Sequence, residues 1–373
     1  MAVHRVRFLS RNRPGSRMGM GHYERLLLRH LVGNAGAHWQ FSVTFDGRGT
    51  GPEIQLDDVP AGCIDATALG YSTLRLARLP WWLARTLTGA FCGPRPALYH
   101  SLSLLFPVPR GTPGVYTVHD LPPTRFDDEG QLPIWAKRAA RAADTIILPS
   151  RFAANEVHEL LGVPESKLRV VPNGCEHDLF HPAVTPATRE QLQTYGVGGP
   201  FVVYVGGASI RKNVAAMLEA WKAVATRHSE LSLLLVGPHD QLMRNVAAAR
   251  APRAFVAGYL GRGVLPSVVK AAEALVCPSI YEGFGLPPLE AMALGVPVIA
   301  VRQGAIPEVV GEAALLADNG SVDSLAQVIQ TLISDPVLRA KLREEGPAQA
   351  AKFDWGQHAR QLLELYEQLT GVA

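Results

Sequence analysis

Short apolar stretches that fit β-strands alternate along the whole chain with amphipathic stretches that fit α-helices. In the first half, a strand at 6–10 precedes a helix at 23–31; in the second half, a strand at 201–205 precedes a helix that runs to residue 228. Strands separated by helices pair in parallel, and each helix returns the chain through a right-handed crossover. The pattern therefore predicts an α/β fold with parallel sheets.

The length of 373 residues is enough for two domains with separate cores. Residues 183–199 contain prolines and paired glycines without helical or strand periodicity, and we interpret them as a linker. This predicts a first domain over 1–182 and a second domain over 200–354. Residues 355–373 then form a last amphipathic helix.

The composition, 47% hydrophobic and 18% charged, is that of a folded protein. A net charge of +3 suits anionic ligands but is too small to predict nucleic-acid binding. The four cysteines lack the spacing of a metal or redox site, and the acidic pairs at 57–58 and 127–128 are expected in loops. We find no signal peptide and no apolar run of about 20 residues. The expectation is a soluble, cytoplasmic protein with free thiols and no bound metal.

The segment 281–295 combines a glycine-spaced loop with the start of a helix, directly after a buried strand. Its two carboxylates are Glu282 in the loop and Glu290, which we place in the first helical turn. Gly283 and Gly285 let a ligand approach the backbone, and the amides from Phe284 to Leu286 precede the helix, where free N–H groups and the helix dipole favour anions. A polyhydroxylated, phosphorylated ligand would use both the amides and the carboxylates. The alternative is a helix with acidic capping residues only.

The residues of this segment, E-G-F-G-L-P-P-L-E-A-M-A, resemble the signature of retaining glycosyltransferases of the family-4 type. The resemblance implies the GT-B fold, in which two Rossmann-like domains face a cleft and the C-terminal helix crosses back to the first domain. It also implies retention of anomeric configuration without a cofactor or metal.

In the first domain, Gly19 and Gly21 lie between a strand and a helix, a layout that places phosphate at a helix N-terminus. The resemblance makes this loop the one that approaches the donor diphosphate, with His22 in place of the usual arginine. His119 and Asp120 follow another strand, where parallel sheets hold ligands. The resemblance implies that His119 contacts the transferred sugar, and Asp120 either orients the imidazole or caps a turn.

In the second domain, Gly207 begins a loop that carries Arg211 and Lys212 between a strand and a helix. A guanidinium fork and an ammonium group at this position are suited to a diphosphate. The resemblance implies that the basic side chains bind the leaving phosphates and that the backbone of the segment 258–260 holds the base. The aromatic ring of Tyr259 offers a stacking face for that base. Glu282 is expected to bind sugar hydroxyls and Glu290 the ribose hydroxyls.

The segment 73–85 is apolar, with arginines at 75, 78 and 85 and tryptophans at 81 and 82. It fits a core helix with solvated arginines, and it also fits a face that contacts an anionic membrane surface or a lipid-linked acceptor. Both interpretations stay open, so peripheral attachment at the inner face of a membrane is one option.

These features predict a retaining glycosyltransferase that moves a sugar from a nucleoside-diphosphate donor to a saccharide, a lipid-linked acceptor or a small molecule. The motif variants look like those of bacterial mannosyltransferases, so GDP-mannose is the first donor to consider and UDP-sugars the second. We see no covalent nucleophile, so a front-face mechanism is our hypothesis.

Other functions share parts of this pattern. They are a nucleotide-sugar hydrolase or epimerase, a pyridoxal-dependent phosphorylase-like enzyme, and a non-catalytic nucleotide-sugar-binding protein. The oligomeric state has no signal in the sequence.

Overall fold

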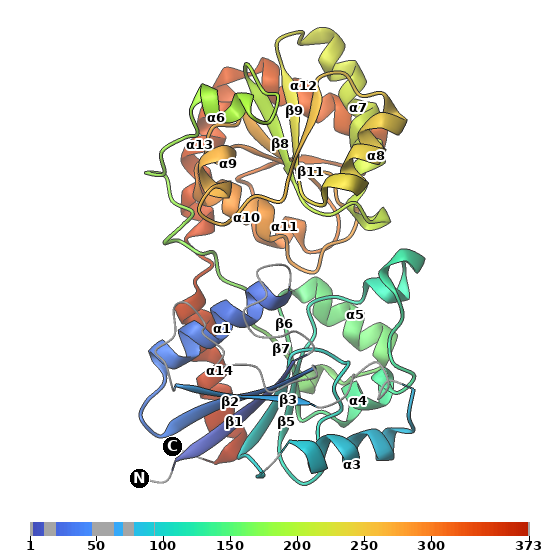
Figure 1. Ribbon diagram of the computed structural model, residues 1–373, viewed down its shortest axis with the longest axis vertical. Coiled ribbons are helices and arrows are strands. Elements are labelled where there is room, and N and C mark those ends of the chain that lie inside the picture. The colour runs from blue at the N-terminus through green and yellow to red at the C-terminus, as the bar shows by residue number, and fades with distance from the viewer. Residues whose placement is uncertain (1–2, 11–19, 47–62, 70–77, 93, 372–373) are drawn as a thin grey trace. The chain divides into compact units, whose positions relative to one another are not determined.

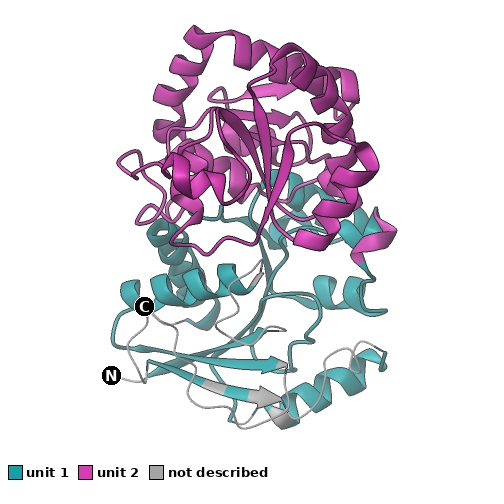
Figure 2. Cartoon of the chain, turned by 45° about the horizontal axis from the view of Figure 1, so that its top comes forward, with its two compact units in different colours: residues 1–125, 130–174, 355–373 teal, residues 126–129, 175–354 magenta. Residues whose placement is uncertain are grey.

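The computed structural model describes residues 3–10, 20–46, 63–69, 78–92 and 94–371 (Figure 1). The internal contacts divide the chain into two compact units (Figure 2). Unit 1 comprises residues 1–125, 130–174 and 355–373, and unit 2 comprises residues 126–129 and 175–354. The last helix of the chain therefore belongs to the same unit as the first strand.

Unit 1 contains a seven-stranded sheet in the order β3-β2-β1-β4-β5-β6-β7, and all neighbouring strands are parallel. The strands are β1 His4–Ser10, β2 Trp39–Asp46, β3 Ile64–Leu69, β4 Leu98–Ser101, β5 Gly114–Thr117, β6 Thr145–Leu148 and β7 Leu168–Val170. The helices are α1 Met20–Asn34, α3 Trp81–Phe91, α4 Ala136–Ala142, α5 Arg151–Leu161 and α14 Trp355–Thr370, with 3₁₀ turns η1 Pro122–Thr124 and η3 Glu165–Lys167.

Unit 2 contains a six-stranded parallel sheet in the order β10-β9-β8-β11-β12-β13. The strands are β8 Phe201–Val205, β9 Ser232–Val236, β10 Ala254–Gly258, β11 Ala274–Cys277, β12 Val298–Val301 and β13 Leu315–Ala317. The helices are α6 Arg189–Gln193, α7 Val214–Arg227, α8 His239–Ala249, α9 Leu265–Lys270, α10 Leu286–Ala293, α11 Ile306–Val310, α12 Val322–Ser334 and α13 Pro336–Ala350, with 3₁₀ turns η2 Asp127–Glu129 and η4 Ile210–Lys212.

The central strands of each sheet are buried because helices cover both sides (Figure 1). In β8, Phe201 and Val203 belong to the core that includes α9, α10 and α11, whereas Val202 and Tyr204 belong to the core that includes α7 and α12. The alternation follows the two-residue period of a strand. It explains why the strands of this chain read as continuous apolar runs.

The region that we interpreted as a linker has structure of its own. Residues 175–199 belong to unit 2 rather than to the first unit or to a free connection. Helix α6 begins with a capping box between Thr188 and Gln191, and Leu192 and Val197 are buried in the unit 2 core. The boundary between the two units thus lies near Gly174, whereas we expected from the sequence that the first domain ends at residue 182.

Among the described residues, none of the helices combines the length and the apolar character that a membrane crossing requires.

Candidate functional site

Two loops of unit 2 leave the sheet at neighbouring strands, because β8 pairs with β11 where the strand order reverses. Parallel α/β sheets bind ligands outside the carboxyl ends of strands at such a reversal. The amide of Ile280, in the loop after β11, donates to the carbonyl oxygen of Arg211, in the loop after β8, at 2.9 Å. The fold therefore joins the two loops whose residues the sequence marks as functional.

Glu282 is held at both of its carboxylate oxygens. Lys212 Nζ lies 2.5 Å from Oε1, and Arg211 Nη1 lies 3.1 Å from Oε2. Burial alone would raise the pKa of Glu282, which is 8% exposed, but Lys212 and then Arg211 outweigh burial, so the pKa falls below its usual value. The three predicted side chains form one cluster with an ionised carboxylate and two cations.

The loop after β8 is shaped by its own side chains. The Tyr204 hydroxyl donates to the carbonyl oxygen of Gly207 at 2.5 Å, and a Cβ at Gly206 would lie 2.6 Å from that hydroxyl. Asn213 adopts a left-handed conformation, and its side-chain Nδ2 donates to the carbonyl oxygens of Pro278 and Gly320. These contacts fix both ends of the segment that presents the two cations.

Residues of the 3₁₀ turn η2 also contact this loop within unit 2. Glu129 Oε1 accepts from Arg211 Nε at 2.6 Å, and Asp128 Oδ2 accepts from the amide of Ile210 at 2.8 Å. Arg211 thus lies between two carboxylates. Sequence reasoning missed this contact, because the acidic residues are 82 positions from the loop along the chain.

The glycine loop before α10 has the backbone shape that only glycine adopts easily. Gly285 is the N-cap residue with φ +111°, and a Cβ there would lie 2.6 Å from Ile306 Cδ1. Among the described residues, the amides of Phe284, Gly285 and Leu286 donate no hydrogen bond within the chain. Unpaired N–H groups at the start of a helix are the kind that bind an anion.

The expectation that Glu290 lies in the first helical turn is wrong. Helix α10 begins at Leu286, and Glu290 is its fifth residue. Pro287 and Pro288 occupy the first turn, where proline is favoured because the missing N–H groups have no partner there anyway.

Glu290 instead belongs to a second buried charge cluster. Arg262 Nη1 donates to Glu290 Oε1 at 2.9 Å, and Arg262 Nη2 contacts Glu176 Oε2. Burial raises the pKa of Glu290, and Arg262 offsets this only in part. Burial by itself would lower the pKa of Arg262, but the two carboxylates outweigh it and raise that pKa. Sequence reasoning missed Arg262 and Glu176.

Tyr259 is 62% exposed, so its ring is open to a ligand. It follows β10 directly, so it lies at the carboxyl ends of the parallel strands, as the two loops described above do. Within the described residues, no three His, Cys, Asp or Glu side chains are grouped as a metal site requires.

In unit 1, Gly19 lies outside the described residues. Helix α1 begins at Met20, three residues before the predicted start, so Gly21 is its second residue rather than part of a loop. Its amide belongs to the first turn, where N–H groups lack an acceptor within the helix.

His119 follows β5 and packs edge-on against the Tyr23 ring of α1, with ring centroids 4.3 Å apart. Its Nε2 atom is buried and has no hydrogen-bond partner among the described residues. Burial, with a smaller effect of His358, lowers the pKa of His119 to about 4. His119 is therefore a neutral imidazole at neutral pH, with one buried nitrogen that has no partner in the described part of the chain.

Tyr23 in turn contacts His358 of α14. His358 Nδ1 lies 2.8 Å from the carbonyl oxygen of Pro172, so this nitrogen carries the proton. Nε2 is then an acceptor, and the Tyr23 hydroxyl, 3.3 Å away, donates to it. This side-chain series fixes the ring against which His119 packs. The sequence did not identify it, because His358 lies in an amphipathic pattern where a histidine is usually structural.

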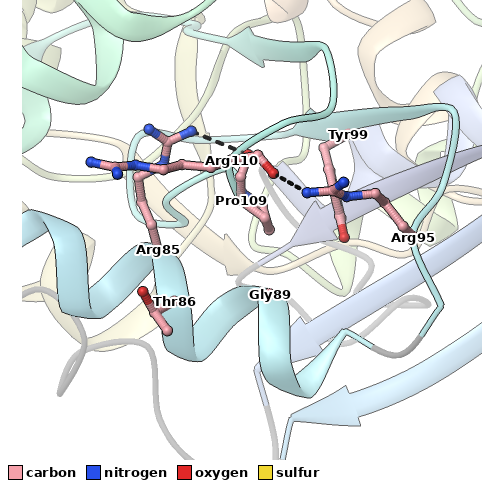
Figure 3. Close-up of a pocket in the computed structure, with 7 residues that line it drawn as sticks. All are labelled: Arg85, Thr86, Gly89, Arg95, Tyr99, Pro109 and Arg110. Atoms are coloured by element: carbon pink, nitrogen blue, oxygen red, sulfur yellow. Dashed lines mark hydrogen bonds between the residues drawn. The ribbon is translucent and has the colours of Figure 1, made fainter.

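A cavity of about 230 Å³ in unit 1 holds none of the predicted site residues (Figure 3). Arg85 of α3 donates there to the carbonyl oxygens of Val108 and Pro109, and Arg95 donates to that of Arg110. Arg85 is thus bound to the protein's own backbone and is not on a free basic face. Of the segment 73–85, residues 73–77 lie outside the described residues, and Trp82 is 60% exposed.

The sequence matches two family models that together span most of the chain. Residues 19–179 match the model described as Glycosyltransferase Family 4, and residues 189–349 match Glycosyl transferases group 1. Alpha-maltose-1-phosphate synthase of Mycolicibacterium smegmatis is 31% identical over 303 residues, which are 73% of this chain and 76% of that protein. O-antigen chain mannosyltransferase B of Escherichia coli is 30% identical over 235 residues, 61% of each chain, so the match leaves over a third of that relative uncovered.

Solved structures of similar fold cover nearly the whole chain. Sucrose-phosphate synthase from Thermosynechococcus elongatus has a TM-score of 0.80 at 21% identity, over 99% of this chain and 100% of that one. Anabaena HepE in complex with UDP-glucose has a TM-score of 0.73 at 20% identity, over 98% of this chain and 100% of that one. At these identities the similarity describes the fold.

Proposed function

Because this chain belongs to the glycosyltransferases of group 1 and family 4, we propose that it transfers a glycosyl group from a nucleoside-diphosphate sugar to an acceptor hydroxyl. The family membership and the GT-B fold predicted from the segment 281–295 are confirmed. The donor, the acceptor and the residue roles below are parts of the proposal.

The observation that carries the proposal is the cluster of Glu282, Lys212 and Arg211. It places two cations and one buried carboxylate at the strand reversal of unit 2, beside three amides at the start of α10. The cations and amides suit a diphosphate, and the carboxylate suits sugar hydroxyls. Few small ligands other than a sugar diphosphate use both.

The chemistry is electrostatic. As the bond between the sugar and the diphosphate breaks, negative charge grows on the phosphate oxygens, and Lys212, Arg211 and the amides of residues 284–286 stabilise it where it develops. The acceptor hydroxyl attacks from the same face, and the leaving phosphate takes its proton, so configuration is retained. His119 contacts the transferred sugar as a neutral hydrogen-bonding group.

The donor we test first is GDP-mannose. O-antigen chain mannosyltransferase B is among the relatives, which supports a mannosyl donor. The complex of HepE with UDP-glucose supports a UDP-sugar as the second choice. The acceptor is a saccharide, a lipid-linked sugar or a small molecule, and the low net charge gives no reason to favour one.

The experiment measures thermal unfolding of the protein with GDP-mannose, UDP-glucose and UDP-N-acetylglucosamine in the absence of metal. A donor at one hundred times its Kd adds about 2.7 kcal/mol to the stability of the binding unit. We expect one donor to raise Tm by several degrees in the wild type and much less in Lys212→Ala. Failure of every nucleotide sugar and free nucleoside diphosphate to bind would contradict the proposal.

The product distinguishes transfer from the alternatives. A hydrolase or epimerase would release free sugar or a changed nucleotide sugar without any acceptor. A glycosyltransferase consumes donor quickly only when acceptor is added, and the new glycosidic bond keeps the donor's anomeric configuration.

A further inference from the structure

Arg262 connects two buried carboxylates that come from distant parts of unit 2. One of its terminal nitrogens binds Glu290 Oε1 of α10 at 2.9 Å, and the other binds Glu176 in the segment that enters the unit. The guanidinium carbon also lies 4.9 Å from the centre of the Phe180 ring. Three contacts therefore fix the position of this guanidinium.

The arrangement leaves one oxygen of Glu290 unused. Among the described residues, Glu290 Oε1 accepts the bond from Arg262, and no hydrogen bond to Oε2 is present. Glu290 is 8% exposed, so a side chain with several rotatable bonds is held in one orientation with a single acceptor atom available. A carboxylate fixed in this way binds a hydroxyl without losing further side-chain entropy.

Arg262 and Glu176 also differ in surroundings from ordinary surface ion pairs. Glu176 is 7% exposed, and the Arg262 Nε atom is buried with no hydrogen-bond partner in the described part of the chain. A structural ion pair would normally satisfy this N–H as well. With all three side chains ionised, the cluster carries a net charge of −1, which favours a neutral diol over a second anion.

We propose that Arg262 is a positioning residue for the nucleoside: it holds Glu290 so that Oε2 accepts the ribose hydroxyls, and Glu176 holds Arg262. The inference rests on the proposed function, because it requires a nucleoside diphosphate in unit 2. It adds a role for two residues that no motif in the sequence marks.

The test compares ribose with deoxyribose in the wild type and in Arg262→Gln. The probes are GDP and UDP, each with its 2′-deoxy and 3′-deoxy forms, and the Kd is measured by calorimetry. In the wild type we expect either GDP or UDP to bind. The Kd of that ribonucleotide should be at least about tenfold lower than the Kd of its deoxy forms, because the ribose hydroxyls donate to an ionised carboxylate. In Arg262→Gln the ratio of the deoxynucleotide Kd to the ribonucleotide Kd should fall close to 1, while the Kd of the deoxynucleotide changes little.

Two further variants keep the result interpretable. Arg244→Gln removes an equal charge from the exposed face of α8 and should leave the ratio unchanged. The double variant Arg262→Gln/Glu176→Gln removes the carboxylate that the first change leaves unpaired, so it should fold if the single variant does not. It is expected to lose the ribose preference as well.

The outcomes separate the two proposals. A ribose preference that persists at its full value in both Arg262 variants would overturn the positioning role and leave the proposed function intact. If neither GDP nor UDP binds the wild type in any form, the proposed function fails and this inference is overturned with it.

Discussion

Lys212 Nζ lies 2.5 Å from Glu282 Oε1, and this salt bridge joins the loops that follow two neighbouring strands, β8 and β11. Both side chains are largely buried, at 15% and 10% exposed. The cation that we assign to the diphosphate is thus already held by the carboxylate that we assign to the sugar. Binding a donor must shift Lys212 from one anion to another or share it between them.

The first prediction is that Lys212→Ala lowers kcat/KM by about 100- to 1,000-fold, which is the usual effect of losing one group that stabilises transition-state charge. Steady-state kinetics with the identified donor measures this. Lys222→Ala is the matched control, because Lys222 lies on the surface of α7 and pairs with Glu219. An equal loss in both variants would contradict a specific role for Lys212.

The second prediction concerns acid stability through Glu282. Its folded pKa is below its unfolded value, so the folded state binds fewer protons. The contribution of Glu282 to stability is present above the unfolded pKa near 4.5 and is lost as the pH falls through the folded pKa. Denaturant unfolding of unit 2 from pH 3 to 7 should show a steeper loss in the wild type than in Glu282→Gln. Identical pH profiles would count against the charged cluster.

The third prediction concerns the buried histidines of unit 1. Burial lowers the pKa of His100 to about 3 and that of His358 to about 4, so both are neutral when folded, whereas unfolded histidine titrates near 6.5. The unfolded state therefore binds more protons between pH 6.5 and 4, and unit 1 loses stability as the pH falls through this window. His358→Gln should reduce the slope of stability against pH in this window, whereas His239→Gln, at an exposed position, should leave that slope unchanged.

The fourth prediction is that Tyr23→Phe destabilises unit 1 by about 1–3 kcal/mol, because the change leaves the buried Nε2 of His358 without its donor. Urea unfolding measures the loss, and Tyr195→Phe is the control. If Tyr23 also orients His119, the NMR signals of the His119 ring will shift in Tyr23→Phe. Unchanged His119 signals would limit Tyr23 to a structural role.

The fifth prediction is that Gly285→Ala costs about 1–3 kcal/mol, since alanine is strained at φ +111° and its Cβ would meet Ile306. The same substitution at Gly198, where a Cβ meets nothing within 4 Å, should be close to neutral. Thermal unfolding compares the two. Donor affinity should fall in Gly285→Ala only, because the loop amides move.

The sequence predicted the parallel α/β architecture and marked Glu282, Arg211 and Lys212 as candidate site residues, because both inferences depend on local patterns. Strands and helices show their own periodicity, and a basic loop and an acidic loop after strands must meet at one edge of a sheet. Strand β3, with the pattern Ile-Asp-Ala-Thr-Ala-Leu, and helix α8 were not predicted, since each has few large apolar residues. Their positions are set by neighbouring elements rather than by their own sequences.

Residues that act through distant partners could not be predicted. Arg262 is a single arginine between two glycines, and only the fold brings it to Glu176, 86 positions earlier in the chain. The prediction that Glu290 lies in the first helical turn was wrong, because two adjacent prolines can either belong to the loop before a helix or begin the helix. Here they begin the helix.

Unit 1 is assembled from separated stretches of the chain, and this sets the order in which the molecule can be completed during synthesis. Trp355, Leu362 and Tyr366 of α14 are buried in the same core as α1 and the first strand, so that core stays open until α14 has been synthesised. The segment from Cys175 to Asp354, by contrast, begins and ends at one parallel bridge and has left the ribosome earlier. Unit 1 therefore begins before unit 2 and is completed after it, and a nascent chain stalled before residue 355 would expose the apolar surface that α14 covers.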